Sequence, residues 1–433
     1  MKYLRLSFFL NCVAFAASAF SEPELPANLA PIKEVTALDK LVKNGSWPQF
    51  QLSVVNEEGP VGYIAKHDGR GIVSVTKPDR NGIARLFGLS KPITNLLALK
   101  MAEDGLFSLD QTIYEFISNS VKKDDLASTL KKFAEPDSDV WRITIRDLMN
   151  HTAGYANNAD FIAPGDLAKT YSRRGLFGIN CFAGKSRTPL GDLVSELNSL
   201  PLVAAPGSKF GLSVSTDVLG FLLELAGNQR LEDLLRNYVA MPLGMSDLHI
   251  ELPEAKQDRM MDLYEPLIKT YPVPGAYQRY QPFSRLPTSD QKAYLEKECI
   301  SAGSGLMASH ADLENLIEML LRGGALENGE RFLDKESMDL YFFDQLEGKF
   351  EGNPLRNTVP FARRDSLSMG FFIKDMKLEN ETRNTIYYYT DYSGSFLWVD
   401  RQNGVGGVLL TQIFPTDHLV FDKTIRGIQR EFL

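Results

Sequence analysis

The chain has 433 residues, of which 44% are apolar and 24% are charged. These proportions exclude a disordered or fibrous protein and predict two or three globular units, or one large interwoven fold. The formal net charge is −8 and no run is rich in Lys and Arg, so no nucleic-acid partner is expected.

The first 19 residues have the pattern of a secretory signal peptide. Lys2 and Arg5 precede an apolar run over 6–16, and the small residues 17–19 follow it. We predict cleavage after Ala19 and export, to the periplasm or out of the cell. No other stretch approaches the ~18 uninterrupted apolar residues of a spanning helix, so the mature chain is expected to have no membrane span.

Two cysteines, Cys181 and Cys299, remain after this cleavage. In an oxidising compartment they are compatible with one disulfide bond, and two buried thiols are the alternative. The histidines of the mature chain show no ligand spacing such as His-x-x-x-His. We therefore expect no metal and no cofactor.

Short strands are predicted after a polar, Pro-dotted N-terminal segment, 20–47, that has room for at most one short helix. Alternating or β-branched runs separated by Gly-containing turns lie at 50–55, 61–65 and 71–75, and predict an antiparallel meander. Apolar residues at helical spacing then predict a helix over 91–104.

Helical patterns dominate from about 108 to 321, for example at 218–226 and 231–240. Residues 251–300 show little periodicity and predict a covering lobe. Strand patterns return at 368–374, 385–389, 395–400 and 407–414, and a last helix is expected at about 420–432.

Strands at both ends and helices between them predict an α+β fold, an α/β sandwich in which N- and C-terminal strands form one antiparallel sheet. A mostly α-helical part is inserted. The expected domain is 48–433, with an α/β subdomain (48–110 plus 301–433) and an α-rich subdomain (111–300).

Six motifs follow one another in a distinctive order. They are Phe-Gly-Leu-Ser-Lys-Pro-Ile-Thr (87–94) with 103–110, Ile-Thr-Ile-Arg-Asp-Leu-Met-Asn-His-Thr-Ala-Gly (143–154), Pro-Gly (206–207), Met-Pro-Leu-Gly-Met (241–245), Ser-Ala-Gly-Ser-Gly-Leu-Met (301–307) and Leu-Trp-Val-Asp (397–400). In this order they resemble the serine β-lactamase, penicillin-binding protein and esterase superfamily, especially its class C-like branch. The resemblance implies a β-lactamase/transpeptidase-like fold.

The first catalytic motif of that superfamily needs a serine and a lysine at i and i+3 on a helix, where the lysine can accept the hydroxyl proton. Alignment on Lys91 as the general base puts Gly88 at the nucleophile position, without a hydroxyl. Ser90 is adjacent to Lys91 in sequence and cannot substitute, because such side chains diverge on a helix. A literal Ser-x-x-Lys at Ser74 precedes a turn and is interpreted as a decoy.

The second and third motifs are also lost. After Pro206-Gly207, the resemblance puts Leu212 at the position of a catalytic tyrosine and Val214 at that of an asparagine. Counting back from Leu-Trp-Val-Asp gives Tyr389-Thr390-Asp391 for the third motif. There a carboxylate replaces the glycine that lets substrate approach the oxyanion wall.

Loss of all three catalytic motifs predicts a catalytically inactive member of the superfamily, a pseudoenzyme with no intact catalytic residue. It would bind a small-molecule, peptide-like, lipid or protein ligand in the old cleft, or serve as a scaffold. The alternative is an active esterase, amidase or β-lactamase-like serine hydrolase with a displaced nucleophile. The ligand-pocket candidates are Ser90, Lys91, Tyr389 and Asp391.

Lys91 needs an explanation, because a cation near a helix N-terminus is disfavoured by the helix dipole. Three alternatives remain open: a carboxylate or phosphate of a ligand, an internal pair with Asp391, and plain solvation. His151 is interpreted as scaffold. The tyrosines around 387–392 are interpreted as packing, and the hydroxyls of Thr390 and Ser393 have no apparent base.

Overall fold

The computed structural model describes most of the chain. The described residues are 27–28, 33–43, 47–67, 79–155, 167, 170, 174, 176, 189–266, 283–285, 300–347, 349–350, 362, 365–377, 383–391 and 393–413. The predicted signal peptide, the strand predicted at 71–75 with Ser74, both remaining cysteines and the last helix at 420–432 lie outside these residues.

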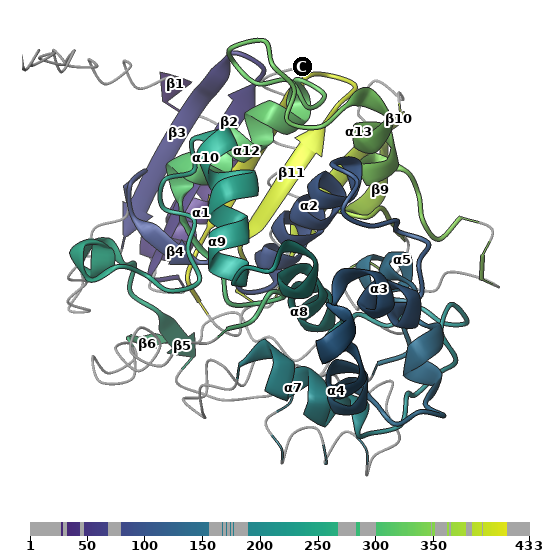
Figure 1. Cartoon of the computed structure of the whole chain (residues 1–433). Helices are drawn as coiled ribbons and strands as arrows, with labels where there is room; N and C mark the ends of the chain where they lie inside the picture. The colour runs from purple at the N-terminus through teal and green to yellow at the C-terminus, as the bar shows by residue number, and fades with distance from the viewer. Residues whose placement is uncertain are drawn as a thin grey trace, which may run out of the picture.

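One eight-stranded sheet forms the centre of the described fold, in the order β1–β3–β2–β12–β11–β10–β9–β8 (Figure 1). Its strands are β1 (Ala27–Asn28), β2 (Gln49–Asn56), β3 (Gly59–His67), β8 (Ser366–Leu367), β9 (Phe372–Lys377), β10 (Arg383–Thr390), β11 (Phe396–Asp400) and β12 (Val405–Leu410). All neighbours are antiparallel except β1 and β3. The N- and C-terminal strands meet where Val54 of β2 is opposite Gly407 of β12, which confirms the predicted sheet.

The join between the two terminal sets of strands depends on a glycine. A Cβ atom on Gly407 would lie 2.2 Å from both the ring of Trp398 and the carbonyl oxygen of Ser53. Only glycine allows this close approach. The indole of Trp398, from the Leu-Trp-Val-Asp motif, can therefore cross the neighbouring strand.

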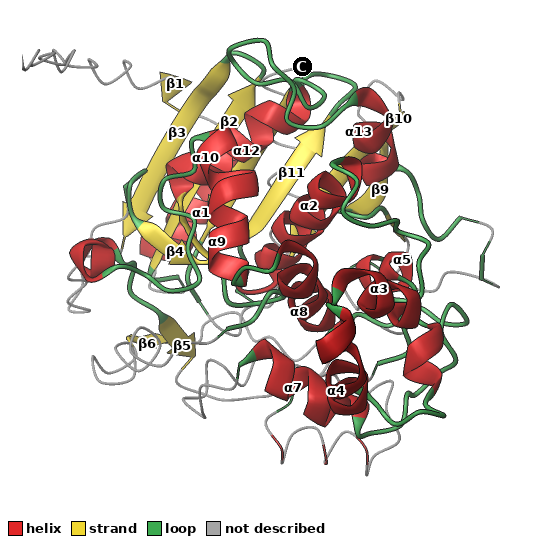
Figure 2. Ribbon diagram, in the orientation of Figure 1, coloured by secondary structure: helices red, strands yellow, loops and turns green. Residues whose placement is uncertain are grey.

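Helices follow and interrupt the strands (Figure 2). They are α1 (Lys33–Lys43), α2 (Ser90–Glu103), α3 (Ile113–Ser120), α4 (Lys123–Phe133), α5 (Ile145–Met149), α7 (Leu190–Asn198), α8 (Ser215–Gly227), α9 (Leu231–Leu235), α10 (Met241–Leu243), α12 (His310–Leu321) and α13 (Lys335–Phe342), with shorter turns η1 (Phe87–Leu89), η2 (Asp139–Arg142), η4 (Arg236–Ala240) and η5 (Glu254–Arg259). Two small two-stranded sheets pair β4 (Ile83–Arg85) with β7 (Met307–Ser309), and β5 (Tyr264–Pro266) with β6 (Phe283–Arg285).

The helix α2 lies between the sheet and the inserted helices α3, α4, α5, α7 and α8 (Figure 1). Ten of its residues are buried, on all sides rather than on one stripe. A helix buried all round is typical of a core position. Two of its buried polar side chains donate hydrogen bonds across the core: Thr94 to the Ala302 carbonyl at 2.7 Å, and Asn95 to the Met149 carbonyl at 3.1 Å. The side-chain oxygen of Asn95 has no hydrogen-bond partner among the described residues. The motif residues at its start are therefore rigidly placed.

Two regions differ from the expectation. The N-terminal segment contains α1, an 11-residue helix that buries Val35, Leu38 and Val42 in the core, so ordered structure begins before residue 48. The strand predicted at 368–374 begins only at Phe372. Ser368 accepts hydrogen bonds from the backbone N–H groups of Gly370 and Phe371, and this local turn replaces the strand pairing.

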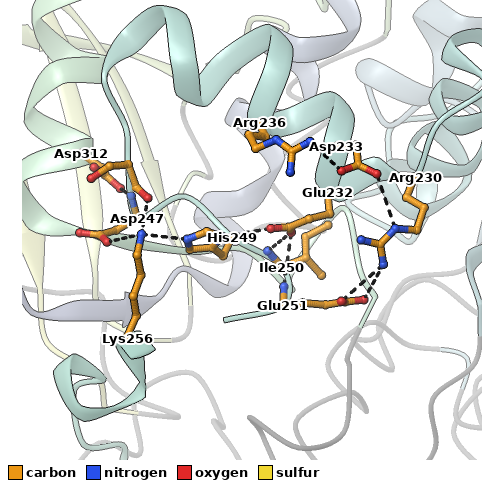
Figure 3. A network of polar contacts seen from close by, with 11 residues as sticks. Arg230, Glu232, Asp233, Arg236, Asp247, His249, Ile250, Glu251, Lys256 and Asp312 are labelled. Atoms are coloured by element: carbon orange, nitrogen blue, oxygen red, sulfur yellow. Dashed lines mark hydrogen bonds and ion pairs between the residues drawn. The ribbon is translucent and has the colours of Figure 1, made fainter. Parts of the chain in front are cut away.

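A polar network ties the segment after α10 to α9 and to α12 (Figure 3). Glu232 of α9 accepts from the Ile250 N–H at 2.6 Å and contacts His249 Nδ1 at 3.0 Å. Asp312 of α12 accepts from the Asp247 N–H at 2.9 Å. Burial, together with the nearby Asp247 carboxylate, raises the pKa of Asp312 to about 7.

This shift predicts a pH dependence of stability. The pKa of Asp312 is higher in the folded than in the unfolded chain. The contribution of Asp312 to the free energy of unfolding is therefore complete below about pH 4 and is lost as the pH rises through about 7. We therefore expect the free energy of unfolding of the wild type to fall between about pH 5 and about pH 8. This fall should be on the order of 2 kcal/mol larger than the fall in Asp312→Asn over the same range.

Urea denaturation at the two pH values measures this difference. The control is Asp334→Asn, at the N-terminus of α13, where the pKa of the carboxyl is lowered and titrates below this range. Equal pH dependence of the wild type and Asp312→Asn would contradict the prediction.

Candidate active site

The first motif begins at η1, which runs directly into α2 and puts Gly88 one turn before Lys91. The spacing predicted from the sequence is therefore present. The site differs from that of a serine hydrolase in the residue that lies opposite Gly88. The turn that follows β10 brings Asp391 to this position, although the two residues are 303 positions apart in the chain.

The side chain of Asp391 lies where a side chain at residue 88, the predicted nucleophile position, would project. Its Oδ2 atom accepts a hydrogen bond from the Gly88 N–H at 2.5 Å. A Cβ atom built on Gly88 would lie 2.8 Å from Asp391 Cβ and 3.0 Å from Oδ2. A side chain at residue 88 and this position of Asp391 therefore exclude each other.

Ser393 holds the Asp391 carboxylate from the other side. Oδ1 accepts from the Ser393 N–H at 2.8 Å and from the Ser393 hydroxyl at 2.6 Å. Burial raises the pKa of Asp391, while the bonds from Ser393 and Gly88 and the charge of Lys91 lower it. The carboxylate has three donors in total, so its position is well defined.

The ammonium of Lys91 donates to the Gly303 carbonyl at 2.8 Å. Among the described residues it forms no direct ion pair, so the internal pair with Asp391 considered above is not formed as a contact. Asp391 acts on it only electrostatically, and less than Asp217 does. Burial lowers the pKa of Lys91 and the two carboxylates oppose this shift.

Asp217 is a site residue that the sequence reasoning missed. It is the third residue of α8, is 3% exposed, and accepts from the Ser301 hydroxyl at 2.6 Å and from the Gly303 N–H at 3.2 Å. Burial raises the pKa of this carboxyl, against the effect of those bonds and of Lys91. Its signal in the sequence was weak: it is the only charged residue between Lys209 and Glu224.

The position predicted for a catalytic phenol holds a partly buried leucine, Leu212. A phenol is present on the other side of the site, where Tyr389 stacks on Phe372 with ring centroids 5.1 Å apart. Tyr389 is 3% exposed, and its hydroxyl has no hydrogen-bond partner among the described residues. Burial, with a smaller effect of Asp391, raises the pKa of Tyr389.

The hydroxyls considered as displaced nucleophiles are engaged elsewhere. Ser90 is fully buried and accepts from the Leu306 N–H at 3.2 Å. Thr390 donates to the Ser395 carbonyl at 2.9 Å, and the hydroxyl of Ser393 donates to Asp391. None of the three is a free hydroxyl beside Lys91.

His151, predicted to be scaffold, is 3% exposed, and its backbone carbonyl accepts from the Gly211 N–H at 2.8 Å. Its ring Nδ1 has no hydrogen-bond partner among the described residues. Burial, together with the charge of Lys91, lowers the pKa of His151 to about 3. The imidazole is therefore neutral at ordinary pH.

In the described part of the chain, no three His, Cys, Asp or Glu side chains are grouped so that they could hold a metal ion. No helix in these ranges is long and apolar enough to cross a membrane.

Comparison with known proteins identifies the family. The Beta-lactamase family model matches residues 37–429. Protein Rv1367c of Mycobacterium tuberculosis is 26% identical over 341 residues, covering 74% of this chain and 72% of that protein. Monacolin J acid methylbutanoyltransferase of Aspergillus terreus is 24% identical over 371 residues, with 80% of each chain covered.

The fold also matches solved structures. EstCE1, a hydrolase with promiscuous acyltransferase activity, superposes with a TM-score of 0.64 at 19% identity, covering 88% of this chain and 93% of that chain. The match of the family model covers most of the chain, including the eight-stranded sheet and the segment in which Gly88 of η1 precedes Lys91 of α2. The chain belongs to the Beta-lactamase family.

Proposed function

We propose that this protein is an exported, non-catalytic member of its family that binds a ligand or partner in the remodelled cleft. The observation that carries the proposal is the Asp391 carboxylate, which lies where a nucleophile side chain would lie and binds the Gly88 N–H. The 19-residue N-terminal pattern supports export.

Acyl transfer by a serine hydrolase needs a nucleophile, a base and donors for the oxyanion. Gly88 supplies no hydroxyl, and its N–H is already bonded to a carboxylate. A negative charge at this point opposes the negative charge that develops on the substrate oxygen. Loss of the nucleophile alone costs about 10⁶ in rate in hydrolases of comparable design.

Retained polar groups support a binding role. Lys91, Asp217 and the hydroxyl of Tyr389, which has no partner among the described residues, remain as polar groups near the predicted nucleophile position. Relatives named as an esterase and as a methylbutanoyltransferase act on acyl compounds. A small-molecule or peptide-like ligand with carbonyl or carboxylate groups is therefore the ligand class that we propose.

An active hydrolase with a displaced nucleophile is the second candidate. The observation that favours it is Lys91, a lysine whose pKa is lowered by burial, as a general base requires. The engaged hydroxyls of Ser90, Thr390 and Ser393 argue against it.

Intact-mass measurement after incubation with a reactive β-lactam and with a small activated ester separates the two candidates. We expect the folded wild-type chain to keep its mass with both reagents, because among the described residues none of the candidate hydroxyls is free beside Lys91. Circular dichroism on the same sample confirms that it is folded. A stoichiometric adduct that maps to Ser74, Ser90 or Thr390 would overturn the proposal and identify a nucleophile.

A further inference from the structure

The environment of Asp391 has the composition of a carboxylate-binding site. Three donors converge on the side chain: the Gly88 N–H, the Ser393 N–H and the Ser393 hydroxyl, at 2.5–2.8 Å. Lys91 adds a positive charge within electrostatic range. Convergent N–H and O–H donors with a cation are what a protein uses to bind an external carboxylate.

Polar atoms without partners lie near Lys91 and near Asp391. The Tyr389 hydroxyl, Thr216 Oγ1 and His151 Nδ1 are buried and have no hydrogen-bond partner within the described ranges. Each residue is at most 3% exposed. A buried polar group without a partner costs on the order of 1–3 kcal/mol, so such a cluster indicates a place built for a polar guest.

The partnerless atoms belong to the same neighbourhood as Lys91. A Cβ atom on Gly303 would lie 3.3 Å from Thr216 Cβ and 3.6 Å from Lys91 Nζ. Lys91 also lowers the pKa of His151, and Asp391 raises that of Tyr389. Hydroxyl and ammonium donors predominate in this group, which favours a ligand with many hydrogen-bond acceptors.

The charges around Lys91 limit which ligands can bind. Lys91 already faces two carboxylates, Asp217 and Asp391, and a third would add repulsion. An external anion is therefore accommodated only when the Asp391 carboxylate is absent from the site.

We propose that Asp391 is a built-in ligand of a small-carboxylate site, and that its side chain and an external carboxylate compete for the same donors. This inference rests on the proposed function, because it takes Asp391 as the group that closes the old active site. Removal of the side chain opens the site to acetate, the probe used below.

The test compares thermal unfolding in sodium acetate and in sodium chloride at equal ionic strength. We expect acetate to raise the Tm of Asp391→Gly by about 2–4 °C in a saturable way, since a ligand that binds only the folded state stabilises it. The wild type and Asp391→Asn, in which the space stays filled, are expected to show no difference between the salts.

A matched control is Asp344→Gly. The Asp344 carboxylate also accepts from two N–H groups and one serine hydroxyl, those of Leu346, Glu347 and Ser366, at 2.6–3.0 Å. It is not part of the group around Lys91, so acetate should not stabilise its variant. Equal stabilisation of both glycine variants would overturn the proposal, because the effect would then be nonspecific.

Absence of an acetate effect on folded Asp391→Gly would also overturn it. If that variant does not fold, Asp391→Ala provides the same comparison, and recovery of folded protein in acetate but not in chloride is then the supporting result. Equal recovery of folded protein in both salts would overturn the proposal. Acylation of the wild type is a separate outcome, which contradicts the non-catalytic role and is read from mass rather than from Tm.

Discussion

The double variant Gly88→Ser/Asp391→Gly is expected to be acylated by an activated ester on the order of 10²-fold faster than the wild type, whereas Gly88→Ser alone is expected to show no gain. The single change puts Cβ within 2.8 Å of Asp391 Cβ. The new side chain and the carboxylate then compete for one space. We expect overpacking to cost about 1–3 kcal/mol of stability in the single variant.

The double variant removes both obstacles. It frees the Gly88-position N–H from the Asp391 carboxylate and puts a hydroxyl one turn from Lys91, whose pKa is already lowered by burial. Loss of a nucleophile costs about 10⁶, and the missing phenol at Leu212 limits how much is recovered, since general acid–base catalysis contributes 10²–10⁴. A gain of about 10² is therefore expected rather than full activity.

Burst-phase release of the ester's leaving group and intact mass measure this gain. Asp391→Gly alone controls for the opened space without a nucleophile, and Lys91→Met in the double variant controls for the base. Both are expected to stay unmodified. Acylation of Gly88→Ser as fast as that of the double variant would show that Asp391 does not block the site.

Asp217→Ala is expected to lower the free energy of unfolding by about 3 kcal/mol. The substitution leaves the Ser301 hydroxyl and the Gly303 N–H without their acceptor in the interior. It also removes the carboxylate with the larger electrostatic effect on the buried Lys91 ammonium. Buried donors left without an acceptor, together with a buried cation that loses part of its electrostatic compensation, are among the few causes of so large an effect from a single change.

Asp192→Ala is the matched control for this prediction. Asp192 is also the third residue of its helix, α7, but it is exposed. Its loss removes only the favourable effect of an anion on a helix N-terminus, about 0.3–1 kcal/mol. Urea denaturation of both variants gives the comparison.

A second measurement tests the link to Lys91. The double variant Asp217→Ala/Lys91→Met also lacks the Lys91 ammonium. The two substitutions together should therefore lower the free energy of unfolding by less than the sum of their separate effects. Strict additivity, or an Asp217→Ala effect no larger than that of Asp192→Ala, would contradict the role assigned to Asp217.

Much of the fold was predictable from local patterns. Alternation predicted β2, β10 and β11, and helical spacing predicted α2 and α8, each to within a few residues. The strand predicted at 368–374 was misplaced, because hydrogen bonds of the Ser368 side chain are not part of a hydrophobic pattern.

Spacing along the chain was enough to predict where the family motifs are altered: glycine at 88, leucine at 212 and a carboxylate at 391. The contacts that these positions make depend on the tertiary structure. The contacts of Asp391 with Gly88, of Lys91 with Gly303 and of Asp217 with Ser301 each join distant segments. Spacing specifies which face of a helix or strand a residue occupies, but partners across the fold depend on how those elements pack.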